Sequence, residues 1–240
     1  TFVVIIGVKI SNKKADSDHP YGHERIECVS AIILSGMLFI IGALIGINGI
    51  KNVTNSSNLV MPGVLALIAS IISIISKEAM YQYTIRVSKK INSAALKADA
   101  WHHRSDALSS IGSFIGILGS RLGFKIFDPL ASVIISLCII KVSIDIFKDA
   151  IDKMVDKSCD KEVIDKVISV IEKNESVKNI DDIKTRQFGN KAYVDVEISV
   201  DENLLLKDAH KVAEEIHNSV ENEINIVKHC MVHVNPYEVK

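Results

Sequence analysis

Uncharged apolar runs in the first 150 residues constrain the fold most. Cys28 to Ile50 and Leu59 to Ser76 carry no charge, and a membrane-spanning helix needs roughly 20 apolar residues. Two shorter runs, Ala107 to Ser120 and Pro129 to Ile140, must extend through neighbouring ionisable residues to cross a bilayer. The alternative, buried helices of a water-soluble protein, would need more polar surface than this half contains. We therefore expect four complete transmembrane helices.

The chain starts inside another apolar run, Thr1 to Val8. This run follows no basic region and precedes no small-residue cleavage site, so it does not have the pattern of a signal peptide. We interpret it as the last turns of a preceding helix, and the chain as an N-terminally truncated fragment.

Charge sets the expected orientation and excludes some functions. Basic residues are frequent before the first complete span, between the second and third, and after the fourth, and sparse in the other two loops. Basic loops face the cytoplasm, so the tail should be cytosolic. The net charge of −1 gives no electrostatic footprint for nucleic acid. There is no phosphate-binding Gly-rich loop, which argues against an ATP-driven enzyme.

Polar residues recur every three or four positions just before and within the third span. They are Asp99, His102, Asp106, Ser109 and Ser113. This spacing predicts one helix face. His102 and Asp106 are four residues apart, so both can approach one metal ion, and imidazole with carboxylate suits zinc and its first-row neighbours. The alternative is that residues 99–106 form an interfacial loop. His103 should point elsewhere.

A second group of metal-ligating residue types precedes the first complete span. Asp16, His19 and His23 flank Pro20 and Gly22, whose tight turn can bring the three side chains together. Histidines beside a membrane surface also occur without a metal, so a plain interfacial loop remains the alternative.

These motifs together resemble the cation diffusion facilitator family. His19-Pro-Tyr-Gly-His23-Glu-Arg-Ile-Glu27 resembles the loop after that family's second helix, and Asp99-Ala-Trp-His102-His-Arg-Ser-Asp106 resembles its fifth. The resemblance implies six helices, a homodimer and proton-coupled export of divalent metal. It makes His102 and Asp106 half of the transport site, and Asp16, His19 and His23 a loop metal site. The first helix and most of the second would then precede Thr1.

Residues 151–240 have the pattern of a small cytosolic α+β domain. Helical periodicity around Val163 to Ile171 is followed by two strands, the second alternating from Tyr193 to Val200. A second helix, from Leu205 to Val220, and a last strand, Val227 to Val234, complete the order αββαβ, which we expect to be ferredoxin-like. The resemblance implies that this domain dimerises.

The resemblance also suggests metal ligands in the tail. His210 and His233 match family positions that bind metal, whereas Asp181, Glu197 and Asn235 replace residues that some relatives use. His229 and His233 are about 13 Å apart along a strand, too far for one ion. His217 is expected to be solvent-exposed surface.

The sequence thus predicts a membrane bundle over residues 1–150 followed by a cytosolic domain over 151–240. The expected function is secondary export of a divalent cation, zinc first, with iron, cobalt or cadmium as alternatives, by proton antiport. The partners expected are a second copy of the chain, the lipid bilayer, metal ions and protons, in a bacterial cell membrane. A membrane-anchored metal sensor is the alternative, although an anchor has no need of ionisable residues within a span.

Overall fold

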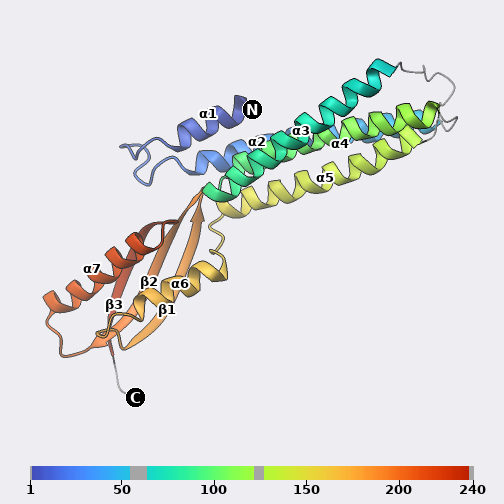
Figure 1. The fold of residues 1–240 in the computed structure, drawn as a ribbon. Coiled ribbons are helices and arrows are strands. Elements are labelled where there is room, and N and C mark those ends of the chain that lie inside the picture. Colours follow the sequence, from blue (N-terminus) through green and yellow to red (C-terminus); the bar gives the residue numbers. More distant parts are fainter. Residues whose placement is uncertain (1, 55–63, 122–126, 238–240) are drawn as a thin grey trace. The chain divides into compact units, whose positions relative to one another are not determined.

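The computed structural model describes residues 2–54, 64–121 and 127–237. It divides into two compact units, Thr1–Ile151 and Asp152–Lys240. The first unit is helical and the second combines helices with a sheet (Figure 1).

Five helices make up the described part of the first unit. They are α1 (Phe2–Ser11), α2 (Arg25–Thr54), α3 (Val64–Ile91), α4 (Ala94–Arg121) and α5 (Phe127–Met154). Four of them are 28 to 30 residues long, and a helix rises about 1.5 Å per residue, so each is long enough to cross a bilayer. Within the described residues, only α2 and the Pro129–Met154 part of α5 are also apolar enough by composition. The number of spans therefore stays a prediction.

Three helices run well past the charged residues that bound the apolar runs. The interpretation of residues 99–106 as an interfacial loop is wrong, because they lie inside α4. α3 and α5 likewise continue beyond Ser76 and Ile140. Charged side chains do not end these helices because they pair with neighbouring helices, as Arg104 does with Glu78 at 2.7 Å. The predicted start of the second span, residues 59–63, lies outside the described residues.

A tight turn joins α3 to α4 and packs them along their length. Asn92 adopts a positive φ of 53°, which asparagine tolerates better than most residues. Ser93 then accepts the Leu96 N–H on its Oγ at 3.2 Å, as an N-cap residue does. The turn brings Ser73 and Ser110 into hydrogen-bond contact at 3.0 Å. The sequence around Asn92 thus folds α4 back against α3.

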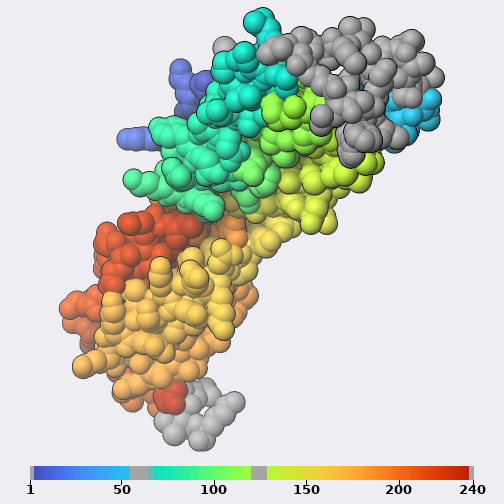
Figure 2. All heavy atoms as spheres, turned by 45° about the vertical axis from the view of Figure 1, so that its right-hand side comes forward, coloured from blue at the N-terminus to red at the C-terminus, as the bar shows by residue number. Residues whose placement is uncertain are grey.

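Small residues let α2 and α5 approach closely. A Cβ added at Gly46 would lie 2.7 Å from the Ser136 Oγ, and one at Gly49 would lie 3.2 Å from the Pro129 carbonyl oxygen. A glycine three or four residues from the next is the usual device for close helix contact in membranes. In Figure 2, α3 (teal) forms part of the surface of this unit, and its exposed side chains include Leu65, Ile72 and Ile75.

The second unit has the predicted order αββαβ. Its elements are α6 (Lys161–Ile171), β1 (Asn179–Phe188), β2 (Lys191–Asp201), α7 (Leu206–Glu223) and β3 (Val227–Tyr237). The sheet is mixed, with order β1-β2-β3: β1 and β2 are antiparallel, and β2 and β3 are parallel. The central strand is therefore β2.

The alternation in β2 explains how the helices pack. Its four inward-facing residues are all nearly inaccessible to solvent, and they join inward residues of α6 and α7 in one core: Val194, Val196, Ile198, Val200, Val167, Ile171, Val212, Ile216 and Val220. Both helices thus cover the same face of the sheet. The predicted assignment of this face is confirmed.

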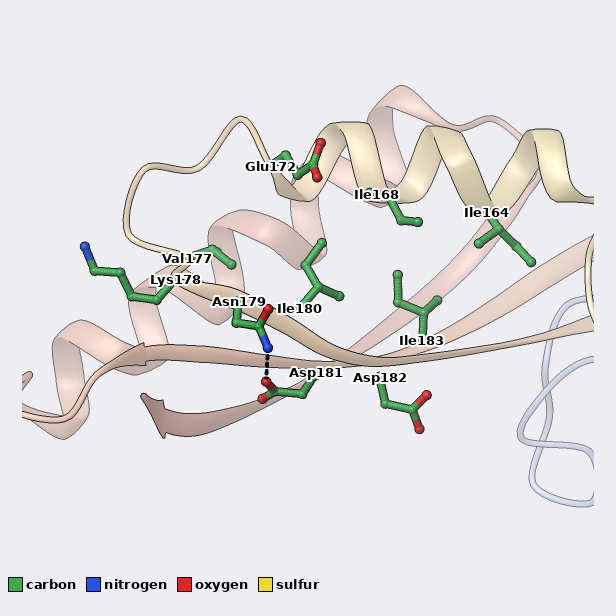
Figure 3. A pocket seen from close by; sticks show the side chains of 10 residues that line it. All are labelled: Ile164, Ile168, Glu172, Val177, Lys178, Asn179, Ile180, Asp181, Asp182 and Ile183. Carbon is green, nitrogen blue, oxygen red and sulfur yellow. Dashed lines mark hydrogen bonds between the residues drawn. The ribbon is translucent and has the colours of Figure 1, made fainter. Parts of the chain in front are cut away.

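A groove of about 590 Å³ lies between α6 and the edge strand β1. Ile164 and Ile168 point into it from the helix, opposite Ile180 and Ile183 of β1 (Figure 3). The Asp181 side chain lies on the other side of the strand, beside Asn179. Among the described residues, no three metal-ligating side chains of this groove come together, and we assign it no role.

Candidate metal sites

The first candidate site is a His–Asp pair on one face of α4. His102 Nε2 lies 3.9 Å from Asp106 Oδ2, and both side chains are about one-third exposed. Two ligands bound to zinc at about 2.0–2.1 Å in tetrahedral geometry are roughly 3.3 Å apart, so a small side-chain rotation brings both atoms to one ion. The structure therefore brings together the two side chains that the sequence paired.

A lysine that the sequence analysis did not single out occupies the same carboxylate. Lys77 of α3 donates to Asp106 Oδ2 at 3.1 Å. It directly follows the apolar run that ends at Ser76. Because α3 continues to Ile91, Lys77 lies in the middle of that helix. If α3 crosses the membrane as the sequence predicts, an unpaired cation in the middle of the helix would be expensive, which makes Lys77 a functional candidate.

Further charged pairs surround this site. Arg104 Nη1 donates to Glu78 Oε1, and Gln82 Nε2 donates to the same oxygen at 2.9 Å. On the buried side of α4, His103 Nε2 lies 3.6 Å from Asp99 Oδ2. Asp99 therefore pairs with the histidine that was expected to point away. Partly exposed charged pairs thus join α3 to α4, and a buried pair lies within α4 itself.

The second candidate site is the loop between α1 and α2. Asp16 is central: its Oδ1 accepts the His19 backbone N–H at 2.8 Å and lies 3.3 Å from His19 Nδ1, and its Oδ2 lies 3.4 Å from His23 Nε2. Gly22, with a φ of 95°, closes the turn. One ligand atom from each of the three residues lies within 4.8 Å of the others. The structure thus gathers the side chains that the sequence grouped.

Electrostatics favour an ionised carboxylate in this loop. The pKa of the exposed Asp16 carboxyl is held below its ordinary value, mainly by the hydrogen bond from the His19 backbone N–H and then by the two nearby imidazoles. The His23 side chain is almost fully buried and its Nδ1 has no hydrogen-bond partner. An ionised carboxylate beside two imidazoles is a ligand set that suits first-row metals.

Glu27 links this loop to the helix that carries the first site. It lies at the start of α2, is only 2% exposed, and its Oε1 accepts the Ala95 N–H at the beginning of α4, at 3.4 Å. The first N–H groups of a helix have no partner within the helix. A carboxylate at this position accepts one of them, and the positive end of the helix dipole stabilises its negative charge. In the sequence, Glu27 stands out only as the end of the motif that begins at His19.

The tail residues predicted from the resemblance are not gathered. His210 and His233 are both exposed, and neither belongs to a metal-ligand cluster among the described residues. His233 lies beside Glu197 in the sheet, whereas His210 lines a different hollow with Asn235. Asp181 accepts hydrogen bonds from Ser199 at 2.6 Å and Asn235 at 3.1 Å, and these lower its pKa.

A different cluster in the tail does come together. His217, Glu221 and His229 each place a ligand atom within 4.8 Å of the others. The expectation that His217 is solvated surface is wrong: it is about one-third exposed and its Nδ1 lies 2.6 Å from the Cys230 carbonyl oxygen. The four-residue spacing of His217 and Glu221 on one helix was a usable signal, but nothing in the sequence paired them with His229.

Known families match both parts of the chain. The cation efflux transmembrane domain family matches residues 1–155, and the cytoplasmic domain family of cation efflux proteins matches residues 159–237. Manganese efflux system protein MneP of Bacillus subtilis (strain 168) is 35% identical over 99% of this chain and 82% of its own length. The uncharacterized transporter YdbO of the same organism is 34% identical over 99% of this chain and 81% of its own length.

Among solved structures, a cadmium form of the MamM CTD covers 32% of this chain and 98% of its own. It is 19% identical, with a TM-score of 0.32.

These matches show an integral membrane protein with a transmembrane domain, a cytoplasmic domain and divalent metal as its substrate. The chain belongs to the cation efflux family, also called the cation diffusion facilitators. Its function is therefore divalent metal efflux, which is transport and not the activity of an enzyme family. The resemblance read from its motifs is confirmed.

Proposed function

We propose that this protein exports a first-row divalent metal ion by proton antiport and that the exported ion binds at His102 and Asp106. The observation that carries this is the pair of metal-ligating side chains on one face of α4, with Nε2 and Oδ2 3.9 Å apart. Two ligands leave a tetrahedral ion incomplete, so other groups of the full-length protein must supply the rest.

Lys77 supports exchange at this site. Its ammonium lies 3.1 Å from Asp106 Oδ2, and a metal at about 2.0–2.2 Å from the same oxygen would have to displace it. The lysine balances the charge of the carboxylate when no metal is bound. Metal binding also requires a neutral imidazole, so protons compete with the ion at His102. Competition of this kind couples metal movement to proton movement.

Two observations bear on the choice of metal. An imidazole ligand favours zinc over manganese, which is the weakest binder of the first-row series and prefers oxygen ligands. We therefore place zinc first. Manganese is the second candidate, because a relative that is 35% identical is named a manganese efflux protein.

We further propose a secondary role for the other predicted ligands. Asp16, His19 and His23 would bind metal at the membrane surface. Glu27 would link this loop to α4, because its carboxylate holds the first turn of that helix. His210 and His233 would bind metal in the tail only with help from a second chain, because they are apart in one chain. The protein would act as a homodimer in a bacterial cell membrane. A membrane-anchored sensor would need the tail sites and not the pair on α4.

The test is metal flux in proteoliposomes with an imposed proton gradient. Asp106→Asn in the full-length protein keeps the shape of the side chain and removes its charge, so we expect zinc flux to fall by at least about 100-fold. The matched control is Asp145→Asn, an exposed carboxylate on α5, which should keep near wild-type flux. Retained flux in Asp106→Asn would contradict the proposal, and a sensor would show no flux in any variant.

A further inference from the structure

We propose that His217, Glu221 and His229 form a binding site for a divalent metal ion, zinc by the chemistry of its ligands, on the tail domain. The distances carry it: Glu221 Oε1 lies 3.4 Å from His217 Nε2 and 3.0 Å from His229 Nδ1. Atoms that share one tetrahedral zinc ion are roughly 3.3 Å apart. Two of the three distances are therefore already close to the spacing that one ion imposes, and the two imidazole nitrogens lie within 4.8 Å of each other.

The hydrogen bonds of His217 leave the right nitrogen free to bind. Its Nδ1 lies 2.6 Å from the Cys230 carbonyl oxygen, an acceptor only, so the proton must be on Nδ1. Nε2 then carries the lone pair that faces Glu221. Metal-binding histidines usually donate their other ring N–H to a backbone carbonyl or a carboxylate, which fixes the tautomer and the ring orientation.

One residue of an edge strand holds two of the ligands. Glu221 Oε1 accepts the Cys230 N–H at 3.0 Å, while His217 binds the Cys230 carbonyl. Since β3 lies at the edge of the sheet, the N–H and C=O of Cys230 would otherwise be unpaired. His229 is the residue before Cys230, so it completes the group from the same strand. The site is thus anchored to backbone groups instead of resting on mobile surface side chains.

This site differs from those proposed above. His217 lies seven residues after His210 on α7, about 10 Å along the helix, and the transport pair belongs to the other unit. The inference does not depend on whether His102 and Asp106 carry the exported ion. Three protein ligands leave one position of a tetrahedral ion for water or another group. An ion there would cross-link the end of α7 to the start of β3.

The competing explanation is that these side chains only cap the strand edge by hydrogen bonds. Two substitutions separate capping from metal binding. His217→Asn places an amide N–H near the position of Nδ1 but has no atom in place of Nε2. Glu221→Gln keeps an oxygen acceptor for the Cys230 N–H but removes the charge. Both preserve the cap and weaken the metal site.

The experiment uses the full chain, without an affinity tag that binds metal, in detergent. A background carrying Asp16→Asn, Asp106→Asn and His233→Ala removes a ligand from each of the other proposed sites. In this background we expect about one equivalent of zinc per chain by equilibrium dialysis. Cobalt in place of zinc should give the visible absorption of a four-coordinate site, and zinc should raise the melting temperature of the tail.

His217→Asn and Glu221→Gln should each weaken zinc binding by at least about tenfold and abolish the cobalt spectrum, with the tail still folded by circular dichroism. The matched control is Glu214→Gln, the same change as Glu221→Gln at an exposed carboxylate of the same helix, which should leave all three readouts unchanged. Absence of zinc binding in the background, or unchanged binding in His217→Asn, would overturn the proposal.

Discussion

The two units of this protein have opposite interiors. In the first, buried side chains include His23, Glu27, Asp99 and His103, while many large apolar side chains are exposed. In the second, the core is nearly all aliphatic and the surface is charged. The difference reflects the solvent around each unit. Lipid does not reward burial of apolar groups within the bundle, so polar groups can occupy its interior. In water, by contrast, the hydrophobic effect favours apolar side chains in the tail core.

The largest expected effect is the loss of unfolding free energy when an apolar side chain is shortened to alanine in each unit. Ile198→Ala in the tail removes a side chain with no solvent exposure and should cost about 2–5 kcal/mol. Leu44→Ala removes a 55% exposed side chain of α2, and should cost less than about 1 kcal/mol because no packed core is lost. Urea unfolding with hydrogen exchange over residues 194–200 and 31–46 measures both. Equal costs would remove the distinction between the two interiors.

A smaller effect concerns the polar interior of the first unit. Glu27→Ala leaves the Ala95 N–H without the acceptor that it has at 3.4 Å, at a cost of about 1–3 kcal/mol. Glu27→Gln keeps an oxygen acceptor and should cost less. Hydrogen exchange of the amides of residues 94–97 should speed up in Glu27→Ala and much less in Glu27→Gln. Slow exchange in both variants would show that Glu27 does not hold the start of α4.

The smallest effect concerns a charge on the outer face of the tail sheet. Hydrogen bonds from Ser199 and Asn235 lower the pKa of Asp181 from its ordinary 3.8. A carboxyl with a lowered folded pKa stabilises the fold above its unfolded value and loses this contribution as the pH falls through the folded value. The difference in unfolding free energy between wild type and Asp181→Asn should therefore be constant near neutral pH and shrink below about pH 4. A pH-independent difference would mean that the charge is not responsible.

The sequence predicts the tail better than the bundle. Strict alternation from Tyr193 to Val200 reflects a strand with one buried face, and the structure has that face packed under α6 and α7. In the bundle, the apolar runs end at Ser76 and begin again at Ala107, and they gave no indication that Lys77 of α3 pairs with Asp106 of α4. Charges within a bundle depend on partners from other helices, which one-dimensional periodicity does not reveal.

For the candidate sites too, the sequence groups residues that are close along the chain and misses contacts between distant elements. Asp16, His19 and His23 are close in sequence, as are His102 and Asp106, and local geometry was enough to group each set. The cluster of His217, Glu221 and His229 requires a helix to lie across a strand edge, so only the tertiary structure brings it together.

The most direct test of the central claim asks whether His102 touches the exported ion. His102→Asp makes this position an oxygen ligand, so zinc should lose its advantage and manganese should gain. His102→Ala should instead weaken transport of both metals, because a ligand is lost without replacement. The measurement is the ratio of zinc to manganese flux in proteoliposomes with an imposed proton gradient. The account predicts a lower ratio in an active His102→Asp protein, and an unchanged ratio with activity retained would contradict it.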